Sequence, residues 1–68
     1  MAITKIYVTV DKKDYAGLYW VSESHGKCRV HVSFADITHV SNPIDKQELG
    51  NAEQVAKDML HALLKNMN

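Results

Sequence analysis

The sequence predicts an α+β domain, in which a three-stranded antiparallel sheet (β-β-β) carries a C-terminal α-helix packed on one face. Stretches in the first half of the chain alternate between apolar and polar residues, as half-buried strands do. The last stretch instead repeats its apolar residues at helical spacing, which is typical of an amphipathic helix. Strands followed by one helix pack most simply as two layers.

The first strand is expected over residues 3–10. Alternation gives it a core-facing set and an outward-facing set, Ile6, Val8 and Val10 against Lys5, Tyr7 and Thr9. The polar segment 11–17 follows and ends in Gly17. We expect this segment to form a hairpin loop longer than the two-residue kind.

The second strand is expected over residues 18–24, where Tyr19, Trp20 and Val21 all favour strand structure. Its register stays open, because either Leu18 and Trp20 face the core or Tyr19 and Val21 do. In both registers one aromatic side chain of this strand lies on the outer face of the sheet, away from the helix.

The third strand is expected from residue 28 to about residue 34, after a short turn in which Gly26 supplies a positive φ. Its two faces alternate without a miss, with Cys28, Val30, Val32 and Phe34 on one side and Arg29, His31 and Ser33 on the other. Cys28, the only cysteine, is expected to behave as a small core residue. A lone cysteine cannot form an internal disulfide, and it fits a reducing, cytoplasmic location.

Residues 35–50 give the least definite prediction. Residues 37–40 either extend the third strand or form a bend, and residues 44–49 form a short fourth strand or a tucked loop. The sheet therefore has room for one short extra strand within residues 37–49.

A helix is expected to begin at Asn51 and to run to the C-terminus. Asn51 is a favoured N-cap, and Gln54 stands where a variant of the capping box needs it. The apolar stripe consists of Ala52, Val55, Ala56, Met59, Leu60, Leu63 and Met67. Leu64 lies at the edge of this stripe and is expected to be partly exposed. We expect Val30, Val32 and Phe34 to be buried against Val55, Met59 and Leu63.

Length and charge limit the classes of function. The chain has 68 residues, which predicts one domain over residues 1–68. Its formal net charge is +0, whereas nucleic-acid-binding domains usually carry an excess of basic residues. No apolar stretch approaches the roughly 20 residues that a membrane span needs. The N-terminus lacks the pattern of a signal peptide.

The sequence predicts no catalytic residues, no cofactor and no metal site, and therefore no enzyme. The possible soft ligands, His25, His31, His39, His61 and Cys28, show neither a CxxC nor an HxxxH pattern. Ser22, Ser24, His25 and Asp36 come nearest to a nucleophile with a base and an acid. A small sheet with one covering helix offers little of the concave space that catalysis needs.

The outer face of the sheet is the predicted binding surface. It is expected to gather Lys5, Tyr7, Arg29 and His31, with Trp20, or Tyr19 in the other register. Aromatic and arginine side chains are the commonest anchors of protein interfaces. The remaining predicted site residues are basic, and they are Lys12, Lys13 and Lys27.

We therefore predict a small non-enzymatic binding or regulatory protein, such as an inhibitor or accessory subunit of the phage or mobile-element type. The outer face is expected to bind a macromolecular partner, with a protein favoured over a nucleic acid and no membrane involved. A second copy of the chain, giving a homodimer, is another candidate occupant. The alternative function is a nucleic-acid-binding βββα module that uses Lys12, Lys13, Lys27 and Arg29.

Short segments of the chain resemble known families. Residues 32–37 (VSFADI) and 52–56 (AEQVA) are similar to segments of small antitoxins of the HicB type, which implies toxin binding. The order of elements looks like that of DNA-binding domains of the AP2 type and of integrase arm-binding domains. Those domains read a DNA groove with the sheet, which implies that Arg29 contacts DNA. The final helix is similar to the last helix of a double-stranded-RNA-binding domain.

Overall fold

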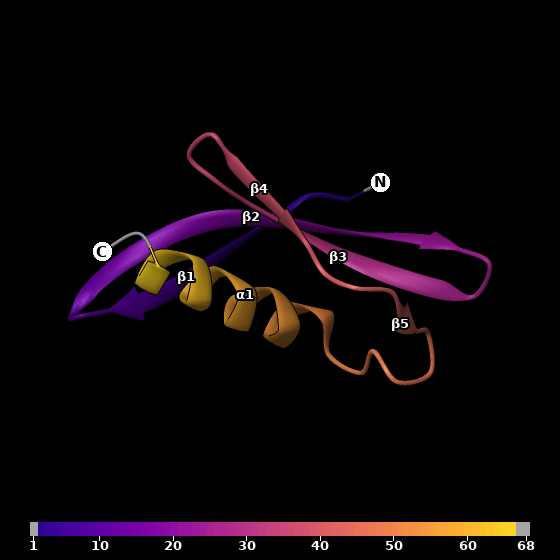
Figure 1. Ribbon diagram of the computed structural model, residues 1–68. Helices are drawn as coiled ribbons and strands as arrows, with labels where there is room; N and C mark the ends of the chain where they lie inside the picture. Colours follow the sequence, from indigo (N-terminus) through magenta and orange to yellow (C-terminus); the bar gives the residue numbers. More distant parts are fainter. Residues whose placement is uncertain (1, 67–68) are drawn as a thin grey trace.

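The computed structural model describes residues 2–66 and shows a twisted antiparallel sheet with one helix across it (Figure 1). The elements are β1 Thr4–Val10, β2 Lys13–Ser24, β3 Lys27–Phe34, β4 Ile37–Val40, β5 Ile44–Asp45 and α1 Ala52–Asn66. Strands β1 to β4 lie side by side in that order, and β5 also pairs with β3. The predicted α+β fold is confirmed, although the sheet is 5-stranded where the sequence predicts three strands and room for one more.

The first hairpin is tighter than predicted. Asp11 and Lys12 alone connect β1 to β2, and their φ angles are positive, 53° and 67°. Tight turns of this type match the twist of the flanking strands, and aspartate tolerates a positive φ better than most residues do. The predicted long loop over residues 11–17 is therefore wrong, because residues 13–17 already belong to β2.

Gly17 lies inside β2 rather than in a turn, and it is buried beneath the helix. A Cβ atom on Gly17 would lie 2.9 Å from Cδ2 of Leu60 and 3.1 Å from the carbonyl oxygen of Ser33. Carbon atoms in favourable contact are about 3.5–4.0 Å apart, so a larger residue fits only if its neighbours move. Gly17 thus allows α1 to approach the middle of the sheet, where Ala56 of the helix is also fully buried.

The register of β2 resolves the alternative that the sequence leaves open. Tyr19 lies opposite Val32, and Trp20 lies opposite His31. Directly opposite residues point to the same face of a sheet. Because Val32 is fully buried under the helix, Tyr19 faces the core and Trp20 faces outward.

The side of β3 that faces away from β2 is closed by two short strands. β4 pairs with residues 31–34 of β3, and β5 pairs with residues 27–28. Ser41 bridges the gap between them, because its N–H donates to the carbonyl of Val30 at 2.9 Å. The N–H of Val30 in turn donates to Oγ of Ser41 at 2.9 Å. Residues 37–40 therefore neither extend the third strand nor form a bend, because they make the separate strand β4. Of residues 44–49, only Ile44–Asp45 form a strand, and a turn follows them.

The helix is capped where the sequence predicts it. The N–H of Gln54 donates to Oδ1 of Asn51 at 3.2 Å, which makes Asn51 the N-cap. The side chain of Gln54 donates instead to Asp58 at 3.0 Å and so takes no part in a reciprocal capping box. Met67 of the predicted stripe lies outside the described residues. Within residues 2–66 no helix has the length and apolar character required to cross a membrane.

The core lies between α1 and the inner face of the sheet. Its buried members are Ile6, Val10, Val30, Val32, Ala56, Leu60, Leu63 and Leu64. Leu64 is 4% exposed, so its predicted partial exposure is wrong. Val55 and Met59 are half-buried, which shows that the stripe is rotated toward Leu64. Phe34 is also half-buried rather than buried, and its ring packs edge-on against Tyr15 with centroids 5.9 Å apart.

Candidate functional site

The sheet register brings five of the predicted site residues together on the outer face, the side of the sheet opposite α1. Lys27 lies on the same side at the end of the sheet, opposite Ser24. Rows of opposite residues run across this face: Lys5–Leu18–Ser33–Thr38, Tyr7–Ala16, Trp20–His31–Val40 and Ser22–Arg29. Members of one row point to the same side of the sheet. Lys5, Tyr7, Trp20, Arg29 and His31 therefore share one surface.

Apolar side chains form a diagonal across the outer face. Tyr7 is 62% exposed, Leu18 is 41% exposed and Val40 is 47% exposed, and Trp20 is half-buried among them. Tyr7, Leu18 and Trp20 lie in adjacent rows of β1 and β2, and Val40 of β4 lies in the row of Trp20 with His31 between them. Together they form the apolar patch of this face. Sequence reasoning missed Leu18 and Val40, because the register of β2 and the existence of β4 both stayed open.

Trp20 and His31 form a stacked pair in this patch. Their rings stack with centroids 5.2 Å apart and planes 8° from parallel. Oγ of Ser22 lies 2.8 Å from Nε2 of His31, within hydrogen-bond distance. The stack and the hydrogen bond both orient the imidazole ring of His31.

The contact between Ser22 and His31 also has the distance of a nucleophile and its base. Such a base is normally oriented by a third group, and the nucleophile needs donors for an oxyanion close by. Asp36, the acid considered from the sequence, lies beyond Phe34 in the β3–β4 turn, whereas Ser22 lies opposite Arg29. The pair therefore lacks the acid that the sequence could offer it.

The predicted basic residues fall at opposite ends of the sheet. Lys12 and Lys13 lie at the β1–β2 turn, whereas Lys27 and Arg29 lie near the β2–β3 turn. The two groups lie at opposite ends of β2, whose 12 residues span about 36 Å. The structure thus divides these residues into two separate pairs.

A hollow of about 310 Å³ lies at one end of the outer face, beside the β2–β3 turn. Its lining residues are Ser22, Ser24, His25, Lys27, Arg29 and Pro43. Lys27 forms an ion pair with Asp45, and Nη1 of Arg29 donates to the carbonyl of Ser41 at 3.4 Å. Arg29 has five N–H donors, so most remain available. Hydroxyl, imidazole and cationic groups line this hollow, and this set suits a carboxylate or another oxyanion.

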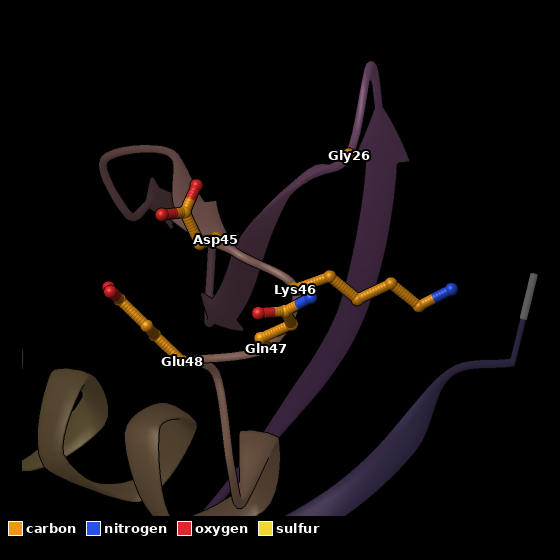
Figure 2. A pocket seen from close by; sticks show the side chains of 5 residues that line it. All are labelled: Gly26, Asp45, Lys46, Gln47 and Glu48. Carbon is orange, nitrogen blue, oxygen red and sulfur yellow. The ribbon is translucent and has the colours of Figure 1, made fainter.

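A second hollow, of about 420 Å³, lies between Gly26 and the turn that follows β5. Figure 2 shows that the carboxylates of Asp45 and Glu48 point to one side of this turn, whereas Lys46 extends to the other. Nζ of Lys46 lies 3.4 Å from Oε1 of Glu23, which ties the turn to the β2–β3 hairpin. Both hollows flank this hairpin, and the first is lined by residues of the outer face, among them Ser22 and Arg29.

The remaining candidate ligands do not converge. Among the described residues no group of three His, Cys, Asp or Glu side chains could hold a metal ion. Cys28 is 3% exposed and faces the core, as its strand position predicts.

Comparison of the chain with models of protein families, with curated proteins and with solved structures finds no match. The short resemblances to antitoxins and to nucleic-acid-binding domains therefore gain no support there.

Proposed function

We propose that this chain is a small non-enzymatic binding protein whose outer face binds a protein partner. The partner surface would be apolar at its centre and bordered by carboxylates. The observation that carries this proposal is the apolar diagonal on the sheet face that α1 leaves bare, in which Tyr7, Leu18 and Val40 are exposed and Trp20 is half-buried. Exposed apolar side chains that lie together on a small domain commonly mark an interaction site.

The charges around the apolar diagonal favour an acidic partner. Lys5 lies in the same row as Leu18, and Arg29 lies in the row next to Trp20. Neither cation forms an ion pair within the described residues. The hollow beside Arg29 adds the hydroxyl of Ser24, which can donate to an acidic side chain. Complementary charge fixes the orientation of a partner and raises its association rate.

A protein fits this surface better than a nucleic acid does. Nucleic-acid affinity comes mainly from neutralising many phosphates along one continuous track. The two basic pairs lie at opposite ends of the sheet, and Lys27 is already neutralised by Asp45. The middle of the outer face is apolar, which suits the centre of a protein interface.

The proposal extends to the role of the complex. A chain of this size that binds through one face acts by occupying a surface of its partner, as inhibitors and accessory subunits do. Short chains of this type are common in phages and mobile elements, an analogy at the level of size and architecture. The unpaired Cys28 fits the reducing environment of the cytoplasm.

The direct test places a photo-crosslinking amino acid at Leu18 in the cell that encodes the protein. Leu18 lies at the centre of the apolar diagonal and tolerates a large side chain because it is exposed. The matched control carries the same amino acid at Lys65, an exposed position in α1. Adducts are identified by mass spectrometry before and after nuclease treatment.

The proposal predicts a discrete protein adduct from position 18 that survives nuclease and is absent from position 65. Its affinity for the purified chain should fall only modestly between about 50 and 200 mM salt, whereas phosphate contacts would make it fall steeply. A nuclease-sensitive adduct would replace this proposal with nucleic-acid binding. Equal adducts from both positions would mean that the outer face is not a specific site.

A further inference from the structure

We infer that the free edge of β1 pairs with the β1 strand of a second copy of the chain, so that two sheets join into one. The two edges of the sheet differ sharply. The β3 side is closed by β4, β5 and Ser41, and the outermost strand there is only 4 residues long. On the other side β1 is the terminal strand, and it runs for 7 residues without proline or glycine. Long regular edges of this kind are templates for strand pairing.

The backbone groups that face this edge follow from the hairpin. Val10 and Lys13 flank the two-residue turn, so they form the hydrogen-bonded pair that closes it. Hydrogen-bonded and non-hydrogen-bonded pairs alternate along an antiparallel ladder. The N–H and C=O groups of Lys5, Tyr7 and Thr9 therefore point away from β2, toward the free edge.

One register pairs the whole of β1 with its copy. An antiparallel arrangement with a two-fold axis at Tyr7 sets Tyr7 opposite Tyr7 of the second copy and Lys5 opposite Thr9. All 7 residues of Thr4–Val10 then find a partner. The register centred on Lys5 would instead place two lysines opposite each other, and like charges in that position are destabilising.

The side chains beside this edge complement one another in the same register. Oγ1 of Thr9 donates to Oδ1 of Asp14 at 2.6 Å, which holds the Asp14 carboxylate toward β1. Thr9 and Asp14 lie opposite each other on the outer face. In the joined sheet Thr9 would lie between Asp14 of its own copy and Lys5 of the second copy. The long side chain of this Lys5 would reach the Asp14 carboxylate. The symmetric interface thus contains two Lys5–Asp14 pairs, which favours a second copy over an unrelated strand.

Pairing would also cover exposed apolar surface. Tyr7 is 62% exposed and would lie beside Tyr7 of the second copy at the centre of the joined sheet. Because opposite residues share a face, both outer faces would lie on one side. The dimer would then present two copies of the apolar diagonal to a partner. This inference rests on the edge of the sheet, although Lys5 and Tyr7 also belong to the proposed binding face, and the experiments test the two separately.

The experiment is sedimentation equilibrium of the purified chain from about 5 µM to about 500 µM, a range that detects micromolar association. Tyr7→Pro removes the N–H at the centre of the edge, where proline is tolerated because that N–H is not used within the chain. Thr38→Pro is the matched control on the opposite edge. Phe34 and Ile37 form the hydrogen-bonded pair that closes a two-residue turn, so the next pair, Ser33 and Thr38, is not hydrogen-bonded. The N–H of Thr38 therefore points away from β3, as the N–H of Tyr7 points away from β2. Circular dichroism and thermal melting establish that each variant is folded.

A charge exchange keeps the test decisive if the proline variant fails to fold. Lys5→Glu should weaken the dimer about tenfold or more, because it sets two carboxylates together. Adding Asp14→Lys to that variant should restore dimerisation, since the pairs re-form with their charges exchanged. Both residues are exposed, so the fold should tolerate these changes.

The inference predicts a monomer–dimer equilibrium that Tyr7→Pro abolishes and Thr38→Pro leaves within about twofold of the parent. A parent chain that stays monomeric at about 500 µM would overturn it. Dimers that persist in folded Tyr7→Pro, or Lys5→Glu that is not rescued by Asp14→Lys, would also overturn it. Neither result would affect the crosslinking test at Leu18, so the two proposals can fail separately.

Discussion

The inner and outer faces of the sheet differ in how much of their apolar surface is exposed to solvent. On the inner face Ile6, Val30 and Val32 are at most 2% exposed, because α1 lies across them. On the outer face Tyr7 and Leu18 keep 62% and 41% of their surface in solvent. Both faces carry apolar side chains in neighbouring positions of the same strands. The difference teaches that alternation alone does not separate a core face from a bare one.

The position of α1 determines which face of the sheet becomes the core face and which stays bare. Gly17 allows Leu60 to reach the backbone of the middle strand, and the neighbouring residue Leu18 points the opposite way. The inner face therefore carries the folding energy of a close-packed core. The outer face keeps apolar surface that the fold does not use, and this surface is available to a partner.

The largest effect on stability is expected at the centre of the inner face. Leu60→Ala should lower the free energy of unfolding by about 2–5 kcal/mol, because it removes a fully buried side chain and leaves a cavity. Urea unfolding followed by circular dichroism measures this change. A loss below about 1 kcal/mol would mean that α1 does not pack on the sheet as described.

The next largest effect on stability is expected from a larger residue at Gly17, where α1 lies closest to the sheet. Gly17→Ala should cost about 1–3 kcal/mol, because the new Cβ meets Leu60 and the carbonyl of Ser33. Ala16→Val is the control, since Ala16 is exposed on the other face and should change stability by about 0.5 kcal/mol at most. Equal costs for the two variants would contradict the contrast between the faces.

The N-cap of α1 should contribute less to the free energy of unfolding than the packing at Leu60 and Gly17 does. Asn51→Ala should cost about 1 kcal/mol, because it leaves the N–H of Gln54 without its partner. Asn51→Asp keeps an acceptor oxygen at this position and serves as the control. Amide exchange should show faster exchange in the first turn of α1 for the alanine variant only. Protection that begins several residues before Asn51 would contradict this assignment of the helix start.

The smallest effect is expected on the outer face. Leu18→Thr should change the free energy of unfolding by about 0.5 kcal/mol or less, because Leu18 is exposed and threonine suits a strand. Together with Leu60→Ala, this variant compares the stability cost of replacing an exposed leucine with that of replacing a buried one. A large destabilisation by Leu18→Thr would contradict the contrast between the faces, because Leu18 would then contribute to the fold as a buried residue does.

Strongly periodic elements could be predicted from the sequence, and weakly periodic ones could not. The alternation around Val30 and the cap at Asn51 are local signals, and the structure agrees with both. Gly17 is typical of a turn, yet its role depends on Leu60, which is far away in the chain. β4 and β5 are short, and they form because β3 offers an open edge to them. Such long-range causes leave no periodic pattern.

The candidate site was predictable to the same extent. The outward direction of Tyr7 and Arg29 follows from alternation within their own strands. The choice of Trp20 over Tyr19 depends on the register of β2, which the two-residue turn of Asp11 and Lys12 sets in the structure. Val40 joins the apolar diagonal only through β4, which the sequence left undecided. The separation of Lys12 from Lys27 likewise appears only once β2 begins at residue 13.

The central claim is that the outer face binds a partner without being required for the fold. The most direct measurement is the affinity of the doubly substituted chain, Tyr7→Ala with Arg29→Ala, for the protein crosslinked at position 18, together with its melting temperature. Binding should weaken by about 2 kcal/mol or more, as expected for central anchors, while the melting temperature stays close to that of the parent. Unchanged affinity with an intact melt would contradict the account, because the partner would then bind elsewhere. A collapsed melt would contradict it as well, because the outer face would then be structural.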